Sequence, residues 1–208
     1  MAAKFLKINP DNPQMNKINE VVDVLRRGGI IIYPTDTVYG LGCDIHNAKA
    51  IEKVCRLKSI NPAKMNLSFI CYDLSHISEY SNLPTNVFKV MKKALPGPFT
   101  FILPSSNKVP KILNTRKNTV GIRIPDNNIP RTIVKELGNP IITTSLKDED
   151  PLIEYPSDPE LIYEKYQKLV DIVIDGGPGN IIASTVIDCT NEEFDVVREG
   201  IGNIEDYL

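Results

Sequence analysis

The fold is decided by the stretch Gly28-Gly29-Ile30-Ile31-Ile32-Tyr33-Pro34-Thr35-Asp36-Thr37-Val38-Tyr39-Gly40-Leu41-Gly42. The apolar run 30–32 is short, β-branched and preceded by two glycines, so it predicts a buried strand. Hydroxyl side chains, one carboxylate and two further glycines follow directly. Since ligands in open α/β sheets bind at the carboxyl ends of strands, the stretch predicts a ligand site. The alternative is a turn in which these polar side chains only satisfy the local backbone.

Strands and helices are predicted to alternate along the rest of the chain. This alternation predicts one α/β domain over residues 1–208, with a twisted, open, mixed sheet and flanking helices. No repeat or domain-scale linker interrupts the sequence. The predicted strands cover 4–8, 30–33, 67–71, 99–103, 120–124, 141–144, 172–174, 185–189 and 196–198, and the predicted helices cover 16–27, 47–58, 84–95, 129–137 and 160–169.

The composition is that of an ordinary globular protein, with 42% hydrophobic and 24% charged residues in a chain of 208. No apolar run reaches the ~18 residues of a membrane span, and residues 1–5 lack the apolar core of a signal peptide. The cysteines are scattered without a CxxC pair, which favours reduced thiols over a disulfide framework or a zinc site. We therefore expect a cytoplasmic protein with no membrane partner. The cysteines are Cys43, Cys55, Cys71 and Cys189.

The charge is uneven although the net charge is only −2, because residues 80–125 contain no Asp or Glu. This interval favours a local anion site, or a surface that binds RNA through its backbone. The alternative is that the charges spread over several solvated faces, because clustering along a chain need not be clustering in space. The basic residues of the interval are Lys89, Lys92, Lys93, Lys108, Lys111, Arg116, Lys117 and Arg123.

Basic and hydroxyl side chains also follow other predicted elements. Arg56 and Lys58 end a helix, where they could bind phosphate or only complement the helix dipole. Arg123 alternates with apolar neighbours on a strand, which suits either a bidentate clamp on an anion or an exposed sheet-face arginine. The hydroxyl runs 143–145 and 184–185 and the Arg198-Glu199-Gly200 segment are each weak evidence alone.

Other chemistries find little support in the sequence. His46 and His76 are isolated, which disfavours a histidine triad or a histidine-rich metal site. There is no GxGxxG after a strand and no GxxxxGK[ST], and the glycine-rich run 176–179 is expected to be a flexible turn. We assign no metal site, because the candidate magnesium ligands are better explained as strand-end aspartates. These candidates are Asp171, Asp175 and Asp188.

The ordered set of motifs resembles the YrdC family, which includes the threonylcarbamoyl-AMP synthases of tRNA modification. The resemblance covers the chain from about residue 17 to its end. It rests on the stretch 28–41, then Lys58, Pro96-Gly97-Pro98-Phe99-Thr100, Gly121-Ile122-Arg123-Ile124-Pro125, Thr144-Ser145, Ser184-Thr185-Val186-Ile187-Asp188 and Arg198-Glu199-Gly200.

The resemblance implies a twisted α/β sheet with a positively charged concave face and a reaction of L-threonine, bicarbonate and ATP. ATP with Mg²⁺ would be a substrate rather than a bound cofactor, and tRNA would be the downstream partner. By position, Thr35, Arg123 and Ser184 would hold threonine, beside Tyr39 of the same motif. Catalytic roles would fall to Lys58 and Ser145, which with Arg198 would hold the phosphates, while Thr119 and Thr143 would line the nucleotide pocket.

Two departures from the synthase pattern point to the YciO branch of the family. The Lys-x-Arg motif reads Lys58-Ser59-Ile60, and the Ser-x-Asn motif reads Ser145-Leu146-Lys147, followed by the acidic run 148–150. Loss of a charged hydrogen bond costs about 1.5–3 kcal/mol. Arg56 and Lys147 are the candidates to compensate at the nucleotide. Members of the family have also been proposed to bind double-stranded RNA, which keeps an RNA-binding module as the alternative function.

Overall fold

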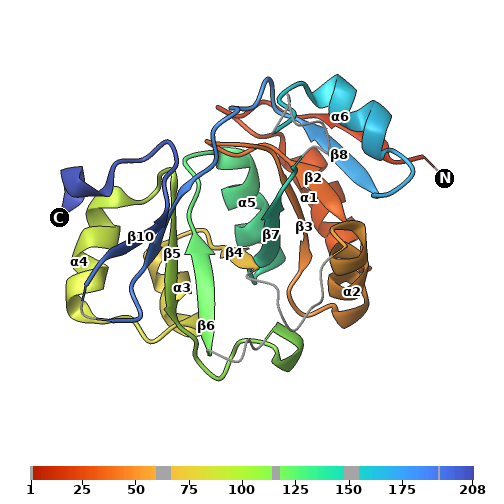
Figure 1. Ribbon diagram of the computed structural model, residues 1–208. Helices are drawn as coiled ribbons and strands as arrows, with labels where there is room; N and C mark the ends of the chain where they lie inside the picture. Colours follow the sequence, from red (N-terminus) through yellow and green to blue (C-terminus); the bar gives the residue numbers. More distant parts are fainter. Residues whose placement is uncertain (1, 60–66, 114–117, 148–154, 192) are drawn as a thin grey trace.

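The predicted alternation forms one ten-stranded mixed sheet in the computed structural model (Figure 1). The structure describes residues 2–59, 67–113, 118–147, 155–191 and 193–208. The strand order is β1-β8-β2-β3-β7-β4-β6-β5-β9-β10, so β1 and β10 are the edge strands. The strands are β1 Lys4–Lys7, β2 Ile31–Tyr33, β3 Gly40–Asp44, β4 Ser68–Ile70, β5 Phe99–Pro104, β6 Thr119–Arg123, β7 Ile141–Ser145, β8 Ile172–Asp175, β9 Thr185–Asp188 and β10 Asp195–Arg198.

The helices divide into two groups that pack on different apolar clusters of the sheet. Helices α1 and α5 share one cluster with β1, β2 and β8, while α2, α3 and α4 share the larger cluster with β3 to β6. Asn47 caps α2 as its sequence predicts, and Gly138 ends α5 in the left-handed conformation. The helices are α1 Met15–Arg26, α2 Ala48–Leu57, α3 Leu74–Tyr80, α4 Thr85–Ala94, α5 Asn128–Leu137 and α6 Pro159–Tyr166, with the 3₁₀ turns η2 Lys111–Leu113 and η3 Ile204–Tyr207.

The opening stretch of sequence is a hairpin of two strands rather than one strand followed by a loop. β2 and β3 are antiparallel, with Tyr33 opposite Gly40, and residues 34–39 connect them. The sequence hides β3 because glycine is unfavourable inside strands. Gly40 is needed here, since a Cβ atom on it would lie 2.9 Å from the Tyr33 ring. The other missed element, α3, is too short to show a helical period.

The strands around β6 separate core residues from polar residues by simple alternation. Phe69, Ile122 and Ile142 point to the larger apolar cluster. Their neighbours Ser68 and Thr143 are paired across β4 and β7 and point to the other face. This second face is apolar where α1 and α5 cover it, and another part of it carries polar residues that line a cavity.

Two expectations from composition can be compared with the structure. All four cysteines are buried and free, and burial raises the pKa of the Cys43 and Cys189 thiols to about 12. Within the described ranges, no three metal-ligating side chains gather, and no helix is long and apolar enough to cross a bilayer.

Candidate functional site

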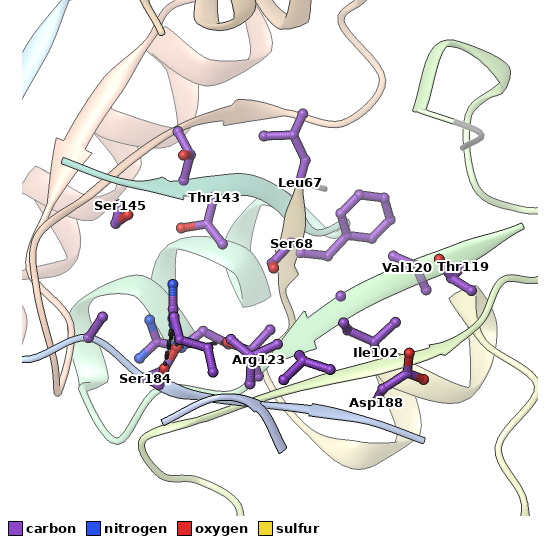
Figure 2. A pocket seen from close by; sticks show the side chains of 18 of the residues that line it. Leu67, Ser68, Ile102, Thr119, Val120, Arg123, Thr143, Ser145, Ser184 and Asp188 are labelled. Atoms are coloured by element: carbon purple, nitrogen blue, oxygen red, sulfur yellow. Dashed lines mark hydrogen bonds between the residues drawn. The ribbon is translucent and has the colours of Figure 1, made fainter. Parts of the chain in front are cut away.

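The polar part of this face forms a cavity with a volume of about 590 Å³. In Figure 2, Thr143 and Ser145 of β7 lie along one wall, and Arg123 and Ser184 lie together on the wall opposite. β4 and β6 run between these walls and contribute Ser68 and Thr119. The remaining lining residues that the argument uses are Tyr39, Gly40, Thr100, Gly121, Asp188 and Arg198.

Arg123 is held from behind by the loop between β2 and β3. Its Nη2 donates to Asp36 Oδ1 over 2.7 Å and to Thr37 Oγ1 over 3.1 Å. The side chains of Arg123 and Asp36 are only 8% and 11% exposed, so the alternative of an exposed sheet-face arginine is wrong. Burial lowers the pKa of Arg123, and the carboxylate of Asp36 opposes that shift. The guanidinium therefore stays charged in the cavity wall.

The wall around Arg123 is completed by two motifs that lie far apart in the sequence. Arg198 donates through Nη2 to the Ser184 carbonyl over 2.7 Å and to the Ser184 hydroxyl over 3.1 Å. The Ser184 hydroxyl also bonds to Thr100 Oγ1 at 2.9 Å. We call Arg123, Ser184 and Arg198 the arginine wall. It presents two guanidinium groups and hydroxyl oxygens to one region of the cavity.

Thr35 and Tyr39 have structural bonds in this region. Thr35 Oγ1 donates to the Val38 carbonyl over 2.7 Å and accepts from Thr37 N, which is the local turn considered as the alternative. The Tyr39 hydroxyl donates to the Gly177 carbonyl over 2.7 Å. Burial raises the pKa of Tyr39, so this phenol stays protonated. Both residues fix the loop that carries Asp36 and Thr37.

Lys58 lies beside the opposite wall, next to Ser145, but is not among the described residues that line the cavity. Its Nζ donates to the Ser145 carbonyl over 3.0 Å, which joins the end of α2 to the end of β7. Burial lowers the pKa of Lys58, and the charges of Lys147 and Lys165 lower it further. We call Lys58, Lys147 and Lys165 the lysine cluster. Positive charges that act on one another beside the end of β7 favour the binding of an anion there.

The remaining predicted site residues divide in position. Thr119 and Thr143 line the cavity, as the nucleotide assignment requires. Arg56 is exposed on the last turn of α2 and is not among the described residues that line the cavity. Lys147 is exposed but acts electrostatically on Lys58. Ile60 and the acidic run 148–150 lie outside the described residues.

Several functional candidates were missed by the sequence analysis. Asp36 and Thr37 belong to the quoted motif, but no contacts were predicted for them. The alternation of Arg123 with apolar residues predicts its face of the strand and does not indicate that Asp36 and Thr37 are its partners. Thr100 stands in the quoted Pro96–Thr100 motif and could have been found there. Lys165 gave no signal, because α6 reaches the lysine cluster only through the fold.

The three aspartates considered as magnesium ligands make local hydrogen bonds instead. Asp171 accepts from Ile30 N, Asp175 from Gly177 N and Asp188 from Thr190, so each completes a local turn or strand end.

The basic residues of the interval 80–125 lie in different places. Lys108 pairs with Glu79 at 2.9 Å, and Lys93 donates to the Tyr207 carbonyl. Together with the buried Arg123, these contacts divide the interval among several places. Arg116 and Lys117 lie outside the described residues.

A family model named for Sua5, YciO and YrdC and described as telomere recombination matches residues 23–200. The chain belongs to this Sua5/YciO/YrdC family. A protein of Escherichia coli strain K12, described as uncharacterized protein YciO, is 41% identical over 208 residues, covering 99% of this chain and 100% of its own. The crystal structure of E. coli YciO has a TM-score of 0.92 at 40% identity, with coverage of 99% and 100%.

The relation to named synthases is more distant. A threonylcarbamoyl-AMP synthase of Psychromonas ingrahamii is 33% identical over 135 residues, covering 64% of this chain and 70% of the synthase. The crystal structure of P. abyssi Sua5 complexed with L-threonine has a TM-score of 0.85 at 25% identity, covering 95% of this chain and 58% of that one. Within the Sua5/YciO/YrdC family, this chain is therefore more similar to E. coli YciO than to these two proteins.

Proposed function

We propose that this protein binds ATP and L-threonine in the cavity and forms threonylcarbamoyl-AMP from them with bicarbonate. One observation carries the proposal: the arginine wall lines one side of a cavity, and Lys58 bonds to the carbonyl of Ser145, which lines the opposite side. A carboxylate needs a forked donor with hydroxyl groups around it, and a triphosphate needs several cations. The two walls match these two requirements.

The arginine wall is the seat for the amino acid. Arg123 lines the cavity and is held rigidly by two acceptors on the β2–β3 loop. Ser184 offers a hydroxyl beside it, fixed by Thr100 and Arg198. Because these groups are already fixed in position, holding a small ligand for reaction costs less entropy. The complex of P. abyssi Sua5 with L-threonine supports threonine as the amino acid of the proposal.

The opposite wall is the seat for ATP. Thr143, Ser145 and Thr119 supply hydroxyl groups along β7 and β6, and the lysine cluster supplies charge at the end of β7. In this assignment Lys147 and Lys165 compensate for the missing arginine of the Lys-x-Arg motif. Magnesium would enter with ATP as part of the substrate.

The reaction requires positioning and charge stabilisation more than acid–base groups. The threonine amine combines with bicarbonate to give a carbamate and water. A carbamate oxygen then attacks the α-phosphorus of ATP, the bond to the β-phosphate oxygen breaks, and pyrophosphate leaves. Lysine side chains stabilise the charge that develops on the leaving pyrophosphate.

The proposal is tested with the full chain, Mg-ATP, bicarbonate and L-threonine. Mass spectrometry should detect threonylcarbamoyl-AMP, and a coupled assay should detect pyrophosphate that depends on threonine. Lys58→Met should lower the rate, while Lys89→Met, on the exposed side of α4, is the matched control. Absence of product together with absence of ATP binding would overturn the proposal.

Binding of RNA through its backbone stays a prediction as the alternative function. The dispersed positions of Lys93, Lys108 and Arg123 give it less support than the cavity gives to nucleotide binding. An RNA-binding surface would lose affinity steeply with salt. Charge reversal at Lys111, Arg116 and Lys117 that left RNA affinity unchanged would count against it.

A further inference from the structure

The charge of Arg123 is balanced by a carboxylate that does not line the cavity. Asp36 is not among the described lining residues, and it meets the guanidinium from the side of the β2–β3 loop. Its Oδ1 lies 2.7 Å from Arg123 Nη2. Both side chains are about nine-tenths buried, so solvent screens the pair only weakly. Asp36 therefore acts on a ligand indirectly, through its contact with Arg123 and through the electrostatic field of its carboxylate.

The balance matters because a second guanidinium stands on the same wall. Arg198 lowers the pKa of Arg123, which reports that the two positive charges repel each other. Arg198 is anchored to Ser184, so it stays beside the cavity. With Asp36 present, the arginine wall carries one excess positive charge, and without it the wall would carry two. An excess of two charges would favour purely anionic ligands.

We infer that Asp36 makes the arginine wall selective for a zwitterionic amino acid over an anion of similar shape. The buried carboxylate offsets one guanidinium and favours a nearby ammonium group, while it disfavours a ligand that brings only a carboxylate. Asp36 is thus a positioning and specificity-determining residue. This inference rests on the proposed function in one respect, since it takes the arginine wall to be the seat of the amino acid.

The test compares L-threonine with (R)-3-hydroxybutanoate, which is L-threonine without its amino group. Calorimetry of the full chain measures both affinities for the wild type, Asp36→Asn and Thr37→Val. Asn keeps the size of Asp and an oxygen that can accept from Arg123, so only the charge is lost. Thr37→Val removes the other acceptor of Arg123 without changing charge, and it is the matched control.

Asp36→Asn should lower the preference for L-threonine over the deaminated acid by about tenfold or more, from the loss of one poorly screened charge. Thr37→Val should weaken both ligands alike and leave their ratio unchanged. Thermal melting and ATP affinity monitor the folding of each variant. Asp36→Glu, which keeps the carboxylate, should retain part of the preference for L-threonine.

The possible failures are distinguishable. An Asp36→Asn variant that weakens both ligands equally would overturn the inference and leave the proposed function standing. A wild type that prefers the deaminated acid would also overturn the inference. A wild type that selects L-threonine but neither binds ATP nor forms the adenylate would overturn the proposed function, while loss of that selectivity in Asp36→Asn would still support the inference.

Discussion

Lys58 donates a hydrogen bond from Nζ to the main-chain carbonyl of Ser145, with 3.0 Å between the two atoms. This bond places a charged group at the point where β7 leaves the sheet. The same residue, Ser145, also lines the cavity. A helix end and a strand end thus meet where a polyanion would bind, although 87 positions separate them in the chain.

Removal of the Lys58 charge should weaken ATP binding without unfolding the protein. A charged hydrogen bond contributes about 1.5–3 kcal/mol, so Lys58→Met should raise the Kd for ATP by roughly tenfold to hundredfold. Calorimetry with Mg-ATP measures the change, and Lys89→Met serves as the control. Equal affinities in the wild type and Lys58→Met would remove Lys58 from the nucleotide site.

The pH dependence of ATP binding should reveal the lowered pKa of Lys58. Burial and the neighbouring lysines favour the neutral amine, so its charge is lost at a lower pH than the ordinary lysine value of 10.5. ATP affinity should therefore fall as pH rises through this lowered pKa. Lys58→Arg should keep its affinity to higher pH because arginine stays charged. Identical pH profiles for the two proteins would contradict the assignment.

The same shift has a consequence for stability with the opposite sign. Between the lowered pKa of Lys58 in the folded protein and its ordinary value, the unfolded chain binds more protons than the folded one. The contribution of Lys58 to the free energy of unfolding should therefore rise with pH through that window. Urea titrations of the wild type against Lys58→Met at alkaline pH isolate this contribution.

Asp36 and Arg123 should behave as one unit in stability measurements. Asp36→Ala leaves a buried guanidinium without its counter-charge, which should cost about 3–5 kcal/mol. The double variant Asp36→Ala/Arg123→Met should lose much less than the sum of the single changes, because neither charge is then left alone. Urea unfolding of the four proteins completes the cycle. Strict additivity would show that the pair does not couple.

Gly40 should be sensitive even to alanine. The added methyl group would lie 2.9 Å from the Tyr33 ring, which is fully buried, and overpacking of this kind costs about 1–3 kcal/mol. Gly121→Ala is the comparison, since its methyl group would meet the Ser68 hydroxyl, the end of a side chain that can rotate. Thermal unfolding should show the larger loss for Gly40→Ala, and the reverse order would contradict this account of the β2–β3 hairpin.

Most of the fold could be predicted from the sequence because the apolar runs have clear periods. The exceptions follow from tertiary contacts. β3 contains two glycines, and it is held as a strand by its pairing with β2 and β7 and by the Tyr33 ring packed against it. α3 spans seven residues, which is too few to define a helical face. In both cases the local signal is weak and the neighbouring elements decide.

The candidate site could be predicted in its residue types more than in its contacts. The sequence placed hydroxyl groups and cations after strands, and the structure gathers Arg123, Thr143, Ser145 and Ser184 around one cavity. It did not indicate that Asp36 pairs with Arg123 or that Lys165 joins Lys58, because these pairs depend on strand order and on where α6 lies.

The alternation along β4, β6 and β7 also bears on how this site could change over evolution. Along these strands, positions in the larger apolar cluster alternate with polar cavity positions, as Ile142 and Thr143 illustrate, while Phe69 and Val120 belong to both sets. Substitutions at polar cavity positions such as Ser68 and Thr143 therefore leave the apolar cluster shared with α2, α3 and α4 unchanged. Insertion of a single residue, by contrast, would exchange the two sets of side chains. Point substitutions can therefore change which ligand such a fold binds, while the lengths of these strands stay constrained.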